Sequence, residues 1–216
     1  MINIYQVYIV PLSILIPLVI SFVNYKFLTD SLKIITFFLV ISGVLNLLAL
    51  FLATHHKPNL IVIHIYTVFE FAFISWFYKL NFRGLISKII PWLIIVFTIL
   101  CIINVLFIQK SLEFNTYTRS LEAVIIIGYS IALFSKESTP DNEYRWGSAN
   151  WINAGILIYF SGCFFTFIFS NYLLTATKTV NHIVWCANDT ILLFEYILFA
   201  VSFYKCRDQS TISSYW

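Results

Sequence analysis

The chain has 216 residues, of which 60% are hydrophobic, 19% aromatic and only 11% charged. Soluble globular domains contain about 25% charged residues, so this composition excludes an ordinary soluble protein and indicates an integral membrane protein. The formal net charge of +3 is small and dispersed, which excludes nucleic acid as a partner. The four cysteines form no CxxC pair, so we predict neither a disulfide framework nor a cysteine metal site, and no cofactor.

Seven segments have the roughly 20 mostly apolar residues that a membrane-crossing helix needs. They are residues 4–24, 34–54, 60–79, 89–108, 115–135, 149–170 and 182–204. The connections between them are too short to hold another folded unit. The sequence therefore predicts an all-α integral membrane protein, a seven-transmembrane-helix bundle in a single domain that covers residues 1–216.

Lysine and arginine are distributed unequally between the two sets of loops. One side of the membrane holds nine of them: Lys26, Lys33, Lys79, Arg83, Lys88, Lys136, Arg145, Lys205 and Arg207. The other side holds four: Lys57, Lys110, Arg119 and Lys178. Because basic loops stay in the cytoplasm, we expect the N-terminus outside and the C-terminus in the cytoplasm, in a bacterial cytoplasmic membrane.

The last predicted span carries two acidic residues, Asp189 and Glu195. A charged carboxylate at mid-membrane costs about 2.5–3.5 kcal/mol on insertion scales, so it indicates a functional site. Polar residues also recur there at intervals of seven, which is close to two helical turns. The two resulting stripes are Asn181, Asn188, Glu195 and Ser202, and beside them His182, Asp189 and Tyr196, with Trp185 between. The opposite side of the helix is apolar and is expected to face lipid.

Alternate spans run in opposite directions, so a rise of about 1.5 Å per residue assigns a depth to each polar residue. His64, Arg119 and Glu122 then fall in the outer half and Glu70 near the middle. Glu195 lies slightly deeper than the middle. We therefore predict a polar cavity open to the outside, with walls from the second, third, fourth, fifth and seventh spans.

Each acidic residue also has a purely structural interpretation. Glu70 shares a helix face with Tyr66, and it is either a ligand contact or a hydrogen bond between helices. Asp189 and Glu195 differ by about 120° around the helix, so they form no catalytic pair on one face. Arg119 either pairs locally with Glu122 or turns inward to meet Asp189 or an anionic ligand.

A metal site has little support. His64 and His182, with nearby acids, could supply ligands, but no HxxxH or HExxH spacing is present, and we predict no metal.

Three functions fit a polar cavity in a seven-helix bundle. We favour a small-ligand-binding or sensory module that signals through a cytoplasmic or membrane partner, by way of loop 136–148 or the tail. Such a module should have a closed-bottomed pocket lined by aromatics such as Tyr66, Tyr129 and Trp185. The alternatives are an intramembrane enzyme acting on a lipid and a proton-coupled transporter, so enzymatic activity stays open. The candidate ligand-binding or proton-carrying residues are Glu70, Asp189, Glu195, His64, Tyr66, Arg119, Glu122, His182, Trp185 and Asn188.

Overall fold

A computed structural model describes residues 4–109, 113–137 and 147–213 of the chain. Within these ranges the chain is helical and contains no strand. The elements are η1 (Tyr5–Ile9), α1 (Val10–Ser13), α2 (Leu15–Val23), η2 (Tyr25–Phe27), α3 (Asp30–Thr54), α4 (Leu60–Asn81), α5 (Leu85–Ile103), η3 (Asn104–Ile108), α6 (Thr116–Glu137), α7 (Ser148–Leu173) and α8 (Lys178–Ser213).

Among the described residues, seven helical stretches are long and apolar enough to cross a membrane, in agreement with the predicted number of spans. They run over Tyr5–Val23, Asp30–Thr54, Leu60–Asn81, Leu85–Ile108, Thr116–Lys136, Ser148–Leu173 and Lys178–Arg207. The second, fourth and seventh begin about one turn earlier than the sequence pattern predicts, because polar first turns continue the apolar helices. By length and composition, the chain is an integral membrane protein.

Proline and glycine explain several helix boundaries. Pro17 has no amide hydrogen to donate to the Ser13 carbonyl four residues earlier, and α1 ends at Ser13, just before α2 begins. Gly84 has a φ of 70°, a left-handed conformation that suits glycine, and it precedes the first residue of α5. The first span is therefore a broken helix, whereas the other six spans each contain one long α-helix.

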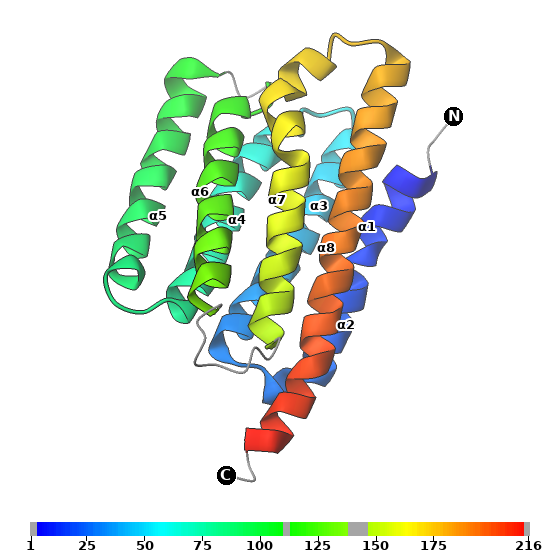
Figure 1. Cartoon of the computed structure of the whole chain (residues 1–216). Helices are drawn as coiled ribbons and strands as arrows, with labels where there is room; N and C mark the ends of the chain where they lie inside the picture. The colour runs from blue at the N-terminus through cyan, green and yellow to red at the C-terminus, as the bar shows by residue number, and fades with distance from the viewer. Residues whose placement is uncertain (1–3, 110–112, 138–146, 214–216) are drawn as a thin grey trace.

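Six of the spans form a ring. Helix α3 packs against α4, α4 against α6, α6 against α7, and α7 against α8, while the first span bridges α8 and α3 through α2 (Figure 1). Helix α5 lies outside this ring and packs against α4. The prediction that the fourth span helps to wall a central cavity is therefore wrong.

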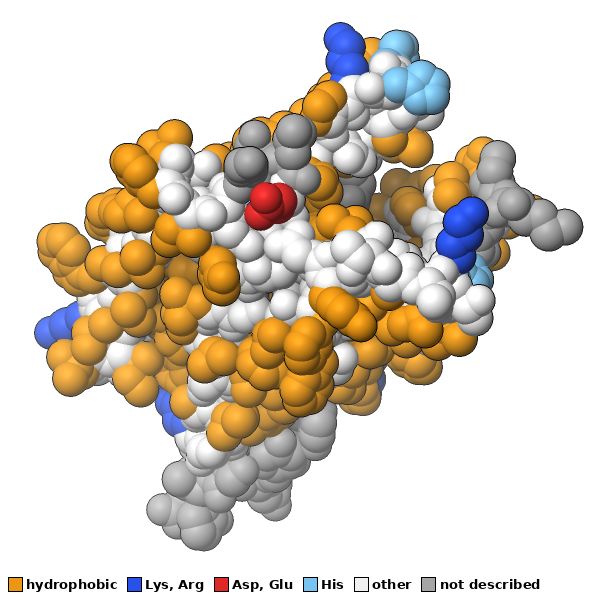
Figure 2. Space-filling model, turned by 90° about the horizontal axis from the view of Figure 1, so that it is seen from above, with side chains coloured by type: hydrophobic (Ala, Val, Ile, Leu, Met, Phe, Trp, Pro, Cys, Tyr) orange, Lys and Arg blue, Asp and Glu red, His pale blue; other side chains and the backbone are white. Residues whose placement is uncertain are grey.

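The two ends of the bundle differ in content. We call the end drawn at the top of Figure 1, where α3, α5 and α7 end and α4, α6 and α8 begin, the upper end. The middle and the lower half are filled with fully buried aromatic side chains from α4, α7 and α8, namely Phe71, Phe77, Tyr78, Phe160, Phe199 and Phe203. Hydrophobic side chains also dominate the outer surface (Figure 2), as expected for a surface in contact with lipid.

Candidate functional site

A buried ion-pair cluster joins α4 and α6 in the upper half of the ring. The Arg119 guanidinium donates through Nη1 to Glu70 Oε2 and, at 3.2 Å, to Glu122 Oε2. The exposed fractions of these residues are 8% for Arg119, 2% for Glu70 and 0% for Glu122. Arg119 therefore pairs locally with Glu122, as one interpretation held, and it also reaches Glu70 of α4, a partner that neither interpretation named.

Aromatic side chains hold the cluster in place. The Tyr66 hydroxyl donates to Glu70 Oε1 at 3.0 Å, and Arg119 Nη2 donates to the Tyr159 hydroxyl at 2.9 Å. The guanidinium also lies over the Phe167 ring, 4.6 Å from its centre, and 5.4 Å from the centre of the Tyr66 ring. Such cation–π contacts are worth up to about 2 kcal/mol in a desolvated site. The geometry thus links three helices, α4, α6 and α7, through one arginine.

Negative groups outnumber the positive group in this region. Glu195 of α8 is 3% exposed, and its carboxyl interacts electrostatically with Glu70 and Arg119. Three buried carboxyls thus lie near one guanidinium, and Glu122 Oε1 has no hydrogen-bond partner among the described residues. A buried charge without compensation is costly, so protons or a cationic group must balance the excess.

A cavity of about 250 Å³ lies directly above the cluster, inside the ring. Helices α3, α4, α6, α7 and α8 and the segment before α6 form its walls. Its aromatic lining comprises Tyr66, Phe114, Tyr159, Phe167, Trp185 and Tyr196, and its polar lining comprises Asn46, Asn115, Arg119, Ser170 and Asn188. The cavity thus combines flat apolar walls with a charged floor, a pattern typical of small-molecule sites.

The Asn188 side chain distinguishes this cavity from a simple packing defect. Asn188 is 8% exposed, lines the cavity, and its Oδ1 has no hydrogen-bond partner among the described residues. Leaving such a group unsatisfied costs about 1–3 kcal/mol. Asn115, in contrast, donates to the Thr67 hydroxyl at 2.7 Å. Asn188 therefore brings to the cavity wall a buried acceptor that has no partner among the described residues.

Seven of the ten predicted site residues lie at this cluster or in the cavity wall. Tyr66, Glu70, Arg119 and Glu122 are hydrogen-bonded to one another, Glu195 is buried beside them, and Trp185 and Asn188 line the cavity. The polar stripe of Asn188, Glu195 and Ser202 faces the inside of the bundle, while Ile183, Phe194 and Ile197 on the opposite side are exposed. Sequence reasoning missed Tyr159 in the middle of its span and Asn115 at the edge of its span, because neither side chain carries a charge that would mark a site within the membrane.

The two histidines lie elsewhere. His64 is buried, but its Nε2 donates to the Glu113 backbone carbonyl at 3.0 Å, which ties the start of α4 to the segment before α6. His182 is exposed, and its ring lies 3.7 Å from the Cys186 sulfur. Neither side chain reaches the cluster, so the expectation that they share one cavity with Glu70 is wrong.

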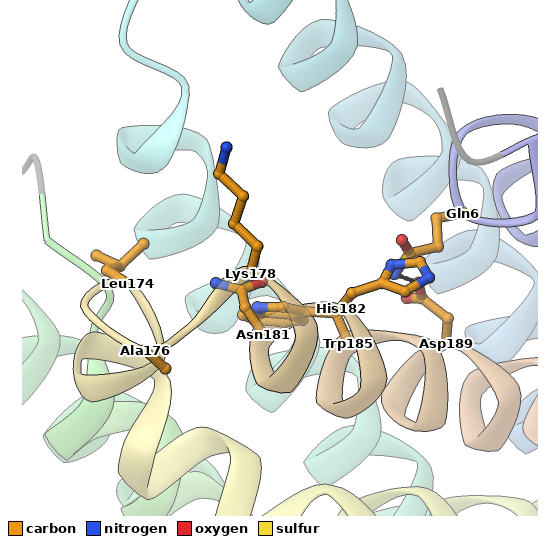
Figure 3. Close-up of a pocket in the computed structure, with 8 residues that line it drawn as sticks. All are labelled: Gln6, Leu174, Ala176, Lys178, Asn181, His182, Trp185 and Asp189. Atoms are coloured by element: carbon orange, nitrogen blue, oxygen red, sulfur yellow. Dashed lines mark hydrogen bonds between the residues drawn. The ribbon is translucent and has the colours of Figure 1, made fainter. Parts of the chain in front are cut away.

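Asp189 faces away from the ring interior. Its Oδ2 accepts a hydrogen bond of 2.9 Å from Gln6 Nε2 of the first span (Figure 3). The next residue, Thr190, bonds the Tyr5 hydroxyl at 2.8 Å. The alternative in which Arg119 meets Asp189 is therefore not realised, since Asp189 bonds Gln6. The cause is the offset of about 120° from Glu195, which turns one carboxylate to the ring interior and the other to the first span.

Tyr129 is also misplaced by the sequence analysis. Its ring packs in the lower half, 5.4 Å from that of Tyr78 and 6.4 Å from that of Phe82, so it does not line the cavity. Within the described ranges, no group of three or more His, Cys, Asp or Glu side chains is placed to hold a metal ion.

Comparison with known proteins adds no further assignment. The chain matches no family model, no curated protein and no solved structure.

Proposed function

We propose that this protein is a membrane-embedded module that binds a small molecule in the cavity inside the ring, called here the ring cavity. Binding of this molecule would be signalled to a partner protein. One observation carries the proposal: a cavity inside the ring has an unsatisfied buried acceptor, Asn188, in its wall and a charged residue, Arg119, in its floor. Empty cavities in proteins are usually apolar, whereas polar cavities hold water or a ligand.

The lining narrows the chemistry of the ligand. A volume of about 250 Å³ is below the usual range for drug-sized ligands, roughly 300–1,000 Å³, so the molecule is small. The Asn188 oxygen requires a hydrogen-bond donor, and the aromatic walls favour a flat or cationic body. The excess of carboxyls beneath the floor of the cavity also favours a positively charged ligand. We therefore propose a small, hydrogen-bond-donating ligand.

In the proposed orientation of the protein, the ligand enters the ring cavity from outside the cell. With nine basic residues on one side and four on the other, the upper end faces outward in a bacterial cytoplasmic membrane. The packed aromatic lower half favours a binding module over a transporter, which needs a polar path to the cytoplasm. Signalling would use the cytoplasmic side, where residues 138–146 of the proposed loop 136–148 lie outside the described residues.

Cysteine labelling tests the orientation. A His56→Cys variant in a background without native cysteines should react with a membrane-impermeant maleimide in intact cells, because His56 lies in the exposed turn at the upper end. Arg83→Cys, at the lower end, should react only after lysis. The opposite labelling pattern would reverse the proposed orientation.

The ligand itself is tested by mass spectrometry of molecules released from the purified protein by denaturation. The wild type should release one small compound in near-stoichiometric amount, and Asn188→Leu should lower its yield at least tenfold. The matched control is Asn104→Leu, which removes a buried amide bonded to Gln109 outside the ring. Equal yields from the two variants, or no compound from the wild type, would refute the proposal.

A further inference from the structure

A second, larger hollow lies on the side of the bundle, between the first span and helices α3 and α8. Its volume is about 770 Å³, and most of its lining is apolar, from residues such as Pro11, Leu15, Leu18, Val44 and Leu47. Leu15, Val44 and Leu47 are also exposed on the surface of a membrane-spanning bundle. We call this hollow the lateral groove. It is open to the part of the bilayer where acyl chains lie.

Polar side chains gather only near the upper part of the lateral groove. Gln6 and Asp189, joined by their 2.9 Å hydrogen bond, line both the groove and a polar pocket of about 520 Å³ above it (Figure 3). That pocket also includes Lys178 and His182. Asn46 of α3 contributes an exposed amide to the lining of the groove. An apolar channel thus leads into a polar pocket that contains charges of both signs.

The dimensions suit one leaflet of a bilayer. The groove extends along the first span from Gln6 to Phe22, a rise of about 24 Å at 1.5 Å per residue. Half of the hydrocarbon core is about 15 Å thick, so the groove accommodates an acyl chain over its whole depth in one leaflet. The view from above shows the surface hollowed beside the projecting part that carries histidine side chains (Figure 2).

We propose that the lateral groove and its polar pocket bind one aminophospholipid, with an acyl chain in the groove and the headgroup in the pocket. The headgroup ammonium is matched by Asp189, the acidic residue that lines both the groove and the pocket. Charge-assisted hydrogen bonds of this kind are about twice as strong as neutral ones. This inference does not depend on the small-molecule function, although the groove and the ring cavity share Asn46, Ala49, Leu192 and Tyr196.

Glycine substitutions provide a matched test. A Cβ added at Gly43 meets no atom within 4 Å, and Gly43 lines the lateral groove but not the ring cavity. Gly43→Phe should therefore fill the groove without a clash in the backbone. Gly128 of α6 is also open to a Cβ and lies on the exposed side of its helix. Gly128→Phe thus adds the same ring to a surface outside the groove.

The experiment is native mass spectrometry of the full chain in detergent, with phosphatidylethanolamine or phosphatidylglycerol added in equal amounts. The wild type and Gly128→Phe should retain one phosphatidylethanolamine, with at least a tenfold preference over phosphatidylglycerol. Gly43→Phe should lose this adduct, and Asp189→Asn should lose the preference, whereas Asp30→Asn at the lower end should keep it. Unchanged melting temperatures would show that the variants are folded.

Two results would overturn the inference: equal binding of the two lipids by the wild type, or equal adducts in Gly43→Phe and Gly128→Phe. Asn188→Leu separates this inference from the proposed function, because it removes the ring-cavity acceptor and leaves the groove intact. Lipid binding that survives in Asn188→Leu supports the groove as an independent site. Its loss in that variant would show that the groove has no binding role of its own.

Discussion

The upper and lower halves of the bundle use polar residues in different ways. In the lower half, the Tyr78 hydroxyl and the Ser130 hydroxyl both donate to Asn153 Oδ1 at 2.7 Å, and Asn153 Nδ2 donates to the Ser130 carbonyl at 3.1 Å. The group is neutral and the Asn153 amide is paired at both ends. In the upper half, charged residues meet beside a cavity. Buried polar atoms without a partner among the described residues occur in both halves, for example Asn188 Oδ1 in the upper half and Asn150 Oδ1 in the lower half.

This difference separates a structural network from a candidate site. Neutral hydrogen bonds between helices stabilise membrane bundles by about 0.6 kcal/mol each on average and need no ligand. Three carboxyls near one guanidinium serve packing poorly, since the desolvation of each charge costs several kcal/mol. The upper half is therefore the candidate site, and the hydrogen bonds of the lower half join the helices.

The largest effect is expected from Arg119→Leu. Removing the guanidinium leaves Glu70 and Glu122 buried without a counter-charge, which typically costs about 3–5 kcal/mol. The melting temperature of the detergent-purified protein should fall sharply. A triple variant with Glu70→Gln and Glu122→Gln should recover much of the loss. If Arg119→Leu left the melting temperature unchanged, the ion pairs of Arg119 with Glu70 and Glu122 would not contribute to stability.

The next largest effects are expected from truncating one aromatic side chain in each half, which should destabilise the protein by different amounts. Phe203 is fully buried in the lower half, so Phe203→Ala should cost about 3–5 kcal/mol through the cavity that it creates. Trp185 is half-buried and already borders the ring cavity, so Trp185→Ala should cost less while lowering the yield of released ligand. Denaturant titration measures the unfolding free energy of each variant. Equal losses in Phe203→Ala and Trp185→Ala would contradict the difference between the two halves.

The smallest effects concern three glycines, two of them in α7 and Gly128 in α6. A Cβ at Gly155 would lie 3.0 Å from the buried Phe199 ring and 3.4 Å from the Glu195 carbonyl, so Gly155→Ala should cost about 1–3 kcal/mol. A Cβ at Gly162 would meet mainly the end of the Ile191 side chain at 2.9 Å, which can rotate away. Gly162→Ala should therefore cost less, and Gly128→Ala, with no contact, least. The melting temperatures of the three variants give the order.

The sequence was sufficient for the number of spans and for the inward face of the last helix. Both depend on local properties, since length and apolarity define a span and the seven-residue spacing of Asn188, Glu195 and Ser202 defines a face. It also placed Glu70 near the middle of the membrane and Arg119 and Glu122 in the outer half, because each residue adds about 1.5 Å along a helix.

Only the tertiary structure decided which of these groups meet. Depth places a side chain along the membrane normal, but the rotation of each helix and its neighbours depend on packing between segments far apart in the chain. This is why Glu195 is buried near Arg119 while Asp189 bonds Gln6, and why α5 lies outside the ring. The ring cavity and the lateral groove arise from the same packing, since each is bounded by helices whose adjacency no local pattern specifies.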